Sequence, residues 1–110
     1  MERPEWVAFS ERELWWDIPD TLKLGLERWV DHGIVPGSFL RAVLQNDFCE
    51  AVLQADYQNV QHLRSIARFV YEVLPYEAWG NRVKVIDWSR KGGLKGNTTH
   101  LWSQREKTDG

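Results

Sequence analysis

Helix-ending and helix-starting residues follow one another closely between Gly33 and Asp56, and they constrain the fold more than any other feature of the chain. Gly33 suits the left-handed position that follows a helix C-terminus, because glycine has no Cβ to clash there. Pro36 presets the backbone for a new helix, with a cap near Ser38 or Val35. The segment therefore predicts short helices that begin and end at defined residues.

Apolar residues inside this segment recur with the period of a helix that buries one face. The first predicted helix has four such positions, Phe39, Leu40, Val43 and Leu44. Asn46 and Asp47 interrupt the pattern, since both side chains compete for backbone hydrogen bonds. A second short helix follows, and its expected inward positions are Phe48, Ala51, Val52 and Ala55. The centre of the chain is thus predicted to be two short helices joined at a polar corner.

Three further helices are predicted around this centre. Residues 20–32 form the first, on a core stripe of Leu22, Leu26, Trp29 and Val30. Residues 56–74, capped by Asp56 and ended by Pro75, form the longest, with a stripe at Val60, Leu63, Ala67, Val70 and Leu74. Asn81 caps the last helix, over about residues 82–90, which is expected to bury Val83, Ile86 and Trp88.

These elements predict an all-α fold, a compact bundle of four to five short helices in a single domain over residues 1–93. Residues 1–16 are acidic and aromatic and are expected to form an N-terminal arm, which is either a short helix or extended from about Ser10. Trp15 and Trp16 cannot both face one core from a helix, so one of them is expected at the surface. Residues 94–110 form a basic, polar tail, either flexible or docked through Trp102.

Composition narrows the classes of function. The net charge of −2 argues against a general nucleic-acid coat protein, whose domains are usually basic. The single cysteine, Cys49, is expected to be a small buried residue, and it allows no intrachain disulfide. No leader and no membrane span are expected, so the predicted location is the cytoplasm. Seven tryptophans in 110 residues are far above ordinary usage and favour a binding surface or an aromatic core.

No catalytic constellation emerges from the residues. The histidines His32, His62 and His100 lack metal-ligand spacing with one another and with Cys49. No serine lies in a nucleophile elbow, and the glycines near residue 93 lack the strand and helix of a phosphate loop. The sequence therefore predicts a protein that is not an enzyme and uses no cofactor.

Three strings carry a family resemblance: LERWVDHGIVPGSFLRAVLQNDFCEAVLQAD, FVYEVLP and AWGNRVKVIDW. Together they resemble a family of small uncharacterised proteins common in phage and prophage genomes, through the pattern GI-PGSFL-AVL-ND. The match covers about residues 22–88 and leaves out the tryptophan-rich arm and the basic tail. The resemblance supplies no catalytic residues. It implies a phage-encoded protein that acts in the cytoplasm of a bacterial host.

The first functional hypothesis is a non-catalytic protein-binding module that inhibits a host defence or regulatory protein. Its expected anchors are exposed tryptophans of the N-terminal arm, Trp6, Trp15 and Trp16. Aromatic anchors within a polar rim are typical of interface hot spots. This hypothesis predicts that removing residues 1–16 leaves a folded core that no longer captures its partner.

The second hypothesis is a sponge that sequesters a nucleotide-type signal, in an oligomer whose interface forms the pocket. A base would stack on Trp79 or Trp88, and the phosphates would be held by Arg64, Arg68, Arg82 and Arg90. The alternative without a binding role is that Arg64 and Arg68 are solvated, or form salt bridges to residues such as Glu72.

A helical DNA-binding module is a weaker third hypothesis. Two short helices with a corner resemble a helix-turn-helix, but the predicted helix from Phe39 to Leu44 has too few polar residues to read bases. In the plain structural alternative, the tryptophans simply fill the core of a small domain. No membrane partner is expected.

Overall fold

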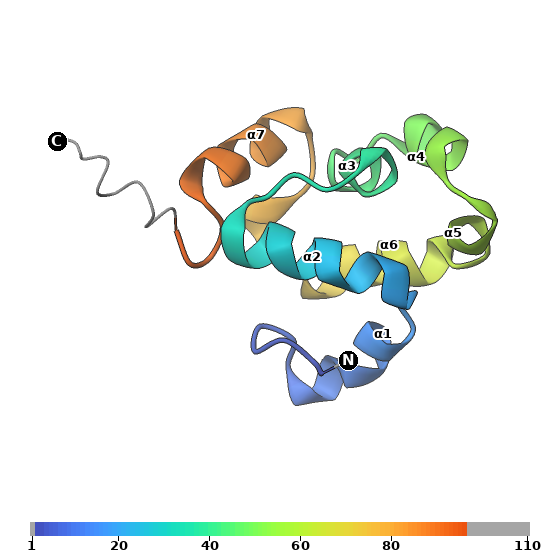
Figure 1. Cartoon of the computed structure of the whole chain (residues 1–110), viewed down its shortest axis with the longest axis horizontal. Helices are drawn as coiled ribbons and strands as arrows, with labels where there is room; N and C mark the ends of the chain where they lie inside the picture. Colours follow the sequence, from blue (N-terminus) through green and yellow to red (C-terminus); the bar gives the residue numbers. More distant parts are fainter. Residues whose placement is uncertain (1, 97–110) are drawn as a thin grey trace, which may run out of the picture.

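The computed structural model describes residues 2–96, and the regular elements in this part of the chain are all helices (Figure 1). In chain order its elements are η1 (Phe9–Glu11), α1 (Arg12–Trp16), α2 (Asp20–His32), α3 (Ser38–Leu44), α4 (Phe48–Gln54), α5 (Tyr57–Gln61), α6 (Leu63–Val73), η2 (Tyr76–Ala78) and α7 (Arg82–Lys91). The all-α class is confirmed. The predicted count of four to five helices is too low, because α1 is a helix and the longest predicted helix is divided.

The division falls at His62, between α5 and α6. Its backbone, at φ −111° and ψ 15°, leaves the α-helical region and closes α5 after five residues. The ring Nδ1 of His62 lies 2.8 Å from the carbonyl oxygen of Gln58, one turn earlier. Ile66 then restarts the helical ladder by donating its N–H to the carbonyl of His62. A continuous apolar stripe predicted one helix here, and a single residue of non-helical backbone makes it two.

The start signals at Asp47, Asp56 and Asn81 and the stop signal at Gly33 are confirmed. The predicted cap near Ser38 or Val35 is wrong, because Gly37 precedes α3 and no side chain caps that helix. Asp47 and Asp56 each accept the backbone N–H three residues later, and so begin α4 and α5. Asn81 does the same for α7. Gly33 ends α2 at φ 68° and Gly92 ends α7 at φ 86°, the left-handed conformation that glycine adopts without a Cβ clash.

In the view of Figure 1, α2 and α6 cross the middle of the molecule, α3 and α4 lie above them, and α1 lies below. The α7 helix and η2 occupy the end next to the C-terminus of α2. One apolar core joins these elements, and its largest fully buried side chains are Trp15, Trp29, Trp88, Phe69, Leu26, Leu44, Ile66, Val7 and Val30. Three of the seven tryptophans thus belong to the core, in line with the plain structural alternative.

The N-terminal segment is part of the core, which corrects its expected role as a separable arm. Trp15 is fully buried, and its ring lies 5.6 Å from that of Phe69 on α6. Trp6 packs edge-on against both rings, at 6.2 Å and 6.1 Å. Trp16 is 58% exposed, as expected for one of two adjacent tryptophans on a helix. Three aromatic rings therefore join the first sixteen residues to α6.

The last described residues close the C-terminal end of α2. Leu94 and Lys95 donate their N–H groups to the carbonyls of Val30 and Asp31, which lack helical partners of their own. This pairing requires Gly93, since a Cβ there would lie 2.5 Å from the nitrogen of His32. The expected docking of the tail through Trp102, and the rest of residues 97–110, lie outside the described residues.

Two predicted buried faces are wrong. On α4, Ala51 is buried, but Phe48 is 75% exposed and Cys49 is exposed too. On α7, the buried positions are Val85 and Trp88, while Val83 is exposed. The indole N–H of Trp88 donates to the backbone carbonyl of Trp29 on α2. This contact determines which face of α7 is turned toward the core. Helical spacing alone fits more than one face of so short a helix, and packing selects one.

An apolar pocket at the α3–α4 corner

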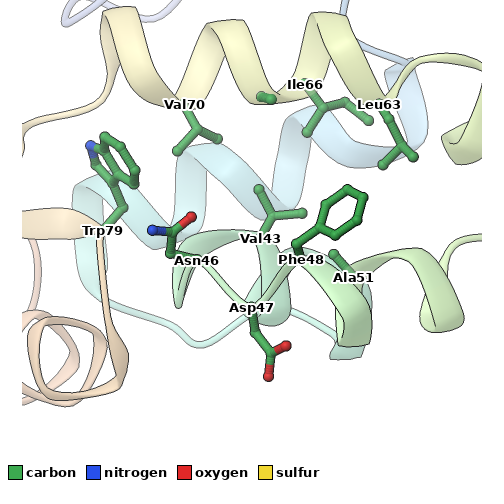
Figure 2. Close-up of a pocket in the computed structure, with 10 residues that line it drawn as sticks. Val43, Asn46, Asp47, Phe48, Ala51, Leu63, Ile66, Val70 and Trp79 are labelled. Atoms are coloured by element: carbon green, nitrogen blue, oxygen red, sulfur yellow. The ribbon is translucent and has the colours of Figure 1, made fainter.

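A cavity of about 160 Å³ opens between the α3–α4 corner and α6 (Figure 2). We call it the corner pocket, and it is lined by Val43, Asn46, Asp47, Phe48, Ala51, Leu63, Ile66, Ala67, Val70 and Trp79. In Figure 2 the side chains of Val43 and Phe48 rise toward those of Leu63 and Ile66, which point down from α6. Trp79 stands at one end of the row, and the Asp47 carboxylate is directed away from the cavity.

The corner itself is built by the polar pair that the sequence marks as a break. Asn46 adopts φ 62°, a left-handed conformation that asparagine tolerates better than most residues. The N–H of Asp47 then bonds to the carbonyl of Ala42 at 2.9 Å, which closes the end of α3. Asp47 Oδ1 in turn accepts the N–H of Glu50 and starts α4. Phe48 is consequently fixed at the first position of α4, on the rim of the pocket.

The opposite wall is one face of α6. Leu63, Ile66, Ala67 and Val70 follow the i, i+3, i+4, i+7 spacing that places side chains on one side of a helix. Ala67 is exposed, and its small side chain leaves this wall open to solvent. On this wall, Ile66 and Val70 are buried and form the apolar floor of the pocket, whereas the exposed Ala67 lies at its mouth.

Trp79 is held at its end of the pocket by backbone and ring contacts. The N–H of the next residue, Gly80, donates to the carbonyl of Leu44 at 2.8 Å and ties the loop to the end of α3. Tyr71 packs edge-on against the indole, with the ring centroids 5.9 Å apart. Trp79 is half-buried, so part of its surface remains available at the pocket.

The size and chemistry of the corner pocket suit one apolar side chain. Ligand pockets for whole small molecules usually measure about 300–1,000 Å³. At about 160 Å³ the corner pocket is smaller than this range. Asn46 and Asp47 are its only lining residues with polar side chains among residues 2–96. The arrangement can desolvate a hydrophobic group, and it offers little to an ionic one.

Exposed apolar side chains follow Phe48 of the pocket rim in the sequence, along α4 and α5. Phe48 and Val52 lie one helical turn apart, and Leu53 is 78% exposed. Tyr57, at the start of α5, is 80% exposed, and Val60 is 48% exposed. We call these five residues the α4–α5 face. Single exposed apolar residues are ordinary, whereas a group beside an apolar cavity is typical of interaction sites.

The tryptophans predicted as exposed anchors separate into two classes. Trp15 is wholly buried and Trp6 packs against the core, so the expectation that both lie free at the surface is wrong. The indole N–H groups of both are enclosed without a hydrogen-bond partner among residues 2–96. Trp16 alone of the three is largely exposed. Residues 1–16 contribute aromatic side chains to the core because α1 packs on α6.

The residues predicted for a nucleotide site lie on different elements, on α6, on α7 and in the loop at Trp79. Trp88 is buried, so no base can stack on it, and this expectation is corrected. Arg68 Nε lies 2.9 Å from Glu72 Oε2, the salt bridge of the alternative without a binding role, and this contact lowers the pKa of Glu72. Arg64 is exposed on α6, while Arg82 and Arg90 are exposed on α7. Of the whole predicted set, only Trp79 lines the corner pocket.

The pocket walls were in part visible in the sequence. Val43, Leu63, Ala67 and Val70 belong to predicted apolar stripes, and helical spacing does not distinguish a pocket wall from a core face. Phe48 was expected to face inward and instead stands on the rim. The signal that marks the site is the Asn46–Asp47 interruption, since a corner between two short helices leaves their apolar faces incompletely covered.

Within residues 2–96, no three histidine, cysteine or acidic side chains group in a way that would hold a metal ion. None of the helices in that range has the length and apolar character needed to cross a bilayer. Comparison of the chain with protein-family models, with curated proteins and with solved structures found no match.

Proposed function

We propose that this protein is a non-catalytic binding module that receives one large apolar side chain of a protein partner in the corner pocket. The observation that carries the proposal is an open apolar cavity beside the α4–α5 face. Hot-spot residues of protein interfaces are commonly large side chains seated in desolvated pockets. The pocket floor at Ile66 and Val70 supplies the desolvated surface, and Phe48 and Trp79 supply aromatic walls.

The biological setting comes from the sequence resemblance to phage and prophage proteins. We propose that the partner is a bacterial host protein of defence or regulation, and that binding inhibits it in the host cytoplasm. A small domain can act in this way without chemistry, because occupying a partner's functional surface is sufficient. The proposed site differs from the N-terminal tryptophans expected at first, because the fold uses Trp15 in its core.

The geometry favours a protein partner over a sequestered nucleotide. Among residues 2–96, no cationic side chain lines the pocket to hold a phosphate, and the Asp47 carboxylate points away from the cavity. Arg68 is already paired with Glu72, so using it for a phosphate would break an existing contact.

Thermal melting with a panel of cyclic nucleotides, oligonucleotide signals and ADP-ribose derivatives distinguishes the two functions. Saturation at 100 times the dissociation constant would stabilise by about 2.7 kcal/mol, and we expect no shift of that size.

A selection from a displayed library of random peptides, with the full chain as bait, tests the proposed function without knowledge of the partner. We expect the enriched peptides to share a large apolar residue, and we expect its replacement by alanine to weaken binding at least tenfold. A truncated hot-spot side chain typically costs about 2 kcal/mol or more, which supports that figure.

Two variants locate the binding site. Ala67→Phe places a ring across the mouth of the pocket from an exposed position, and Phe48→Ala removes one wall without opening the core. Thr21→Phe is the matched control, because Thr21 is also exposed on a helix but does not line the corner pocket. We expect the first two variants to bind weakly and the control to bind normally, all with native circular dichroism. Equal binding by all four proteins would refute the site.

A further inference from the structure

The corner pocket and the α4–α5 face lie in a stretch of chain with charges of one sign. From Ala42 to Leu63 the sequence contains three carboxylates, Asp47, Glu50 and Asp56, and neither lysine nor arginine. All three residues are exposed. Asp47 and Asp56 stand at the N-termini of α4 and α5, where each accepts one backbone N–H. Their positions are thus fixed by the same caps that shape the corner.

The neighbouring cations do not cancel this charge. On α3 Arg41 precedes Val43 by two residues, and on α4 Glu50 follows Phe48 by two, so each charged side chain leaves its helix about 160° from the residue that lines the pocket. Arg68 is paired with Glu72 across one turn of α6. Arg64 is exposed on α6, one residue after Leu63 of the pocket wall, and Lys84 lies against Gly80, the residue after Trp79, with its Nζ 3.4 Å from the carbonyl oxygen of Tyr76. From Arg41 to Val73 the sequence carries four carboxylates and three arginines, a net charge of −1.

We propose that the partner presents its apolar anchor from a segment rich in lysine or arginine. This inference rests on the proposed function and specifies the chemistry of the partner at the same site. Cationic side chains beside the anchor would approach Asp47, Glu50 and Asp56, which strengthens the complex and speeds its formation. The long aliphatic stems of lysine and arginine would also cover exposed rings such as Phe48 and Tyr57.

Charge argues against a symmetric dimer as the occupant of this face. In a twofold interface the same patch meets itself, so the three carboxylates of one copy would face those of the other. Like charges opposed across an interface cost several kcal/mol. A head-to-tail contact with α7 of a second copy is the remaining self-association, because α7 exposes Val83 and Ile86 together with Arg82 and Arg90. Light scattering of the native chain and of the Arg90→Glu variant tests this head-to-tail contact.

The test analyses the flanks of the anchor in peptides selected against the full chain. It uses the variant Asp47→Asn, Glu50→Gln, Asp56→Asn, in which asparagine preserves both helix caps while the negative charge is removed. The matched control is Glu13→Gln, Asp17→Asn, Asp87→Asn, which removes three exposed carboxylates from α1, its C-terminus and α7. Affinities are measured by fluorescence anisotropy at low and high salt.

We expect lysine and arginine to be enriched beside the anchor in peptides that bind the native chain. These peptides should bind the cap-preserving variant roughly tenfold more weakly, since three exposed and individually weak ion pairs are lost together. The control variant should bind them normally. The difference should shrink at high salt, because dissolved ions screen exposed charges beyond a Debye length of about 3 Å at 1 M.

Different failures have different meanings. Selected peptides with an apolar anchor but no excess of cationic residues would overturn the inference and leave the proposed function standing, as would equal affinity for the cap-preserving variant. Peptides that bind equally well to the Ala67→Phe and Phe48→Ala variants would overturn both the inference and the proposed function.

Light scattering of the native chain adds a third outcome. A mass that rises with concentration, and falls when Arg90→Glu is introduced, would identify α7 of a second copy as the occupant and overturn the proposed partner.

Discussion

The indole N–H of Trp88 donates a 2.8 Å hydrogen bond to the backbone carbonyl of Trp29, which lies 59 residues earlier in the chain. The indole N–H of Trp29 in turn donates to the carbonyl of Ala78 at 3.0 Å. These two bonds join α7, α2 and η2 through the centre of the core. They give two of the seven tryptophans a structural role that an apolar residue of similar size could not perform.

Trp88→Phe is expected to destabilise the protein more than Trp15→Phe. Both indoles are buried, but Trp88 loses a hydrogen bond, whereas the Trp15 N–H has no partner among the described residues. A broken buried hydrogen bond costs about 1–3 kcal/mol beyond the change in volume. Chemical denaturation followed by circular dichroism measures both variants. Equal losses would mean that the Trp88 bond contributes nothing net to stability.

Gly93→Ala is expected to cost about 3 kcal/mol or more, from left-handed strain together with steric overlap. Its Cβ would lie 2.6 Å from the carbonyl oxygen of Val30 and 2.5 Å from the nitrogen of His32. Gly96→Ala separates the two causes, because Gly96 has φ 71° but nothing within 4 Å of an added Cβ. Only the strain, about 1–2 kcal/mol, should remain there. Thermal melting of both variants checks the difference.

Trp15→Ala is expected to cost about 3–5 kcal/mol, the usual range for a large aromatic side chain removed from a core. Trp16→Ala should change stability by about 0.5 kcal/mol or less, since the Trp16 side chain is largely exposed. Deletion of residues 1–16 should therefore yield an unfolded or molten chain. If the deletion protein melted cooperatively at the melting temperature of the full chain, residues 1–16 would be a separable arm after all.

Glu27→Gln is expected to stabilise the protein at neutral pH by about 0.2–0.5 kcal/mol. Burial, and secondly the nearby Asp31 carboxylate, raise the pKa of Glu27 above 4.5 in the folded state. The folded protein thus takes up this proton at a higher pH than the unfolded chain, so the charged form is penalised above the folded pKa and the penalty disappears below about 4.5. The advantage of the variant should vanish over that window. Glu13→Gln, at an exposed position on α1, controls for charge removal.

Cys49 is expected to react with a thiol reagent in the folded protein at a rate close to that of the unfolded chain. Its side chain is exposed on α4, next to Phe48. Absorbance assays with an aromatic disulfide in native buffer and in denaturant compare the two rates. Strong protection in native buffer would show that α4 is covered, for example by a second copy of the chain. Prior saturation with a selected peptide should slow the reaction if the corner pocket is the binding site.

Local signals determined where most helices begin and end. Gly33, Asp47, Asp56, Asn81 and Gly92 each act through their own backbone or a hydrogen bond to a residue three positions away. Such contacts depend on neighbours in the chain, so the sequence reveals them directly. The exception is His62, where an unbroken apolar stripe hid a break that its own backbone makes.

Packing decided what periodicity could not. Which face of α4 and α7 is buried, and which of two adjacent tryptophans enters the core, depend on contacts with helices tens of residues away. Helices of seven to ten residues carry too few turns for spacing alone to choose a face. The corner pocket depends on the same contacts, because it exists only where α6 and Trp79 fail to cover the faces of α3 and α4.

By itself, then, the sequence determined an all-helical chain with a sharp corner at Asn46–Asp47 and an excess of tryptophan. The tertiary structure decided that Trp15, Trp29 and Trp88 hold the core together, and that the corner opens into an apolar pocket. The physical reason is the range of the interactions. Caps and turns are settled within a few residues, while burial is settled by surfaces that meet only when the whole chain has folded.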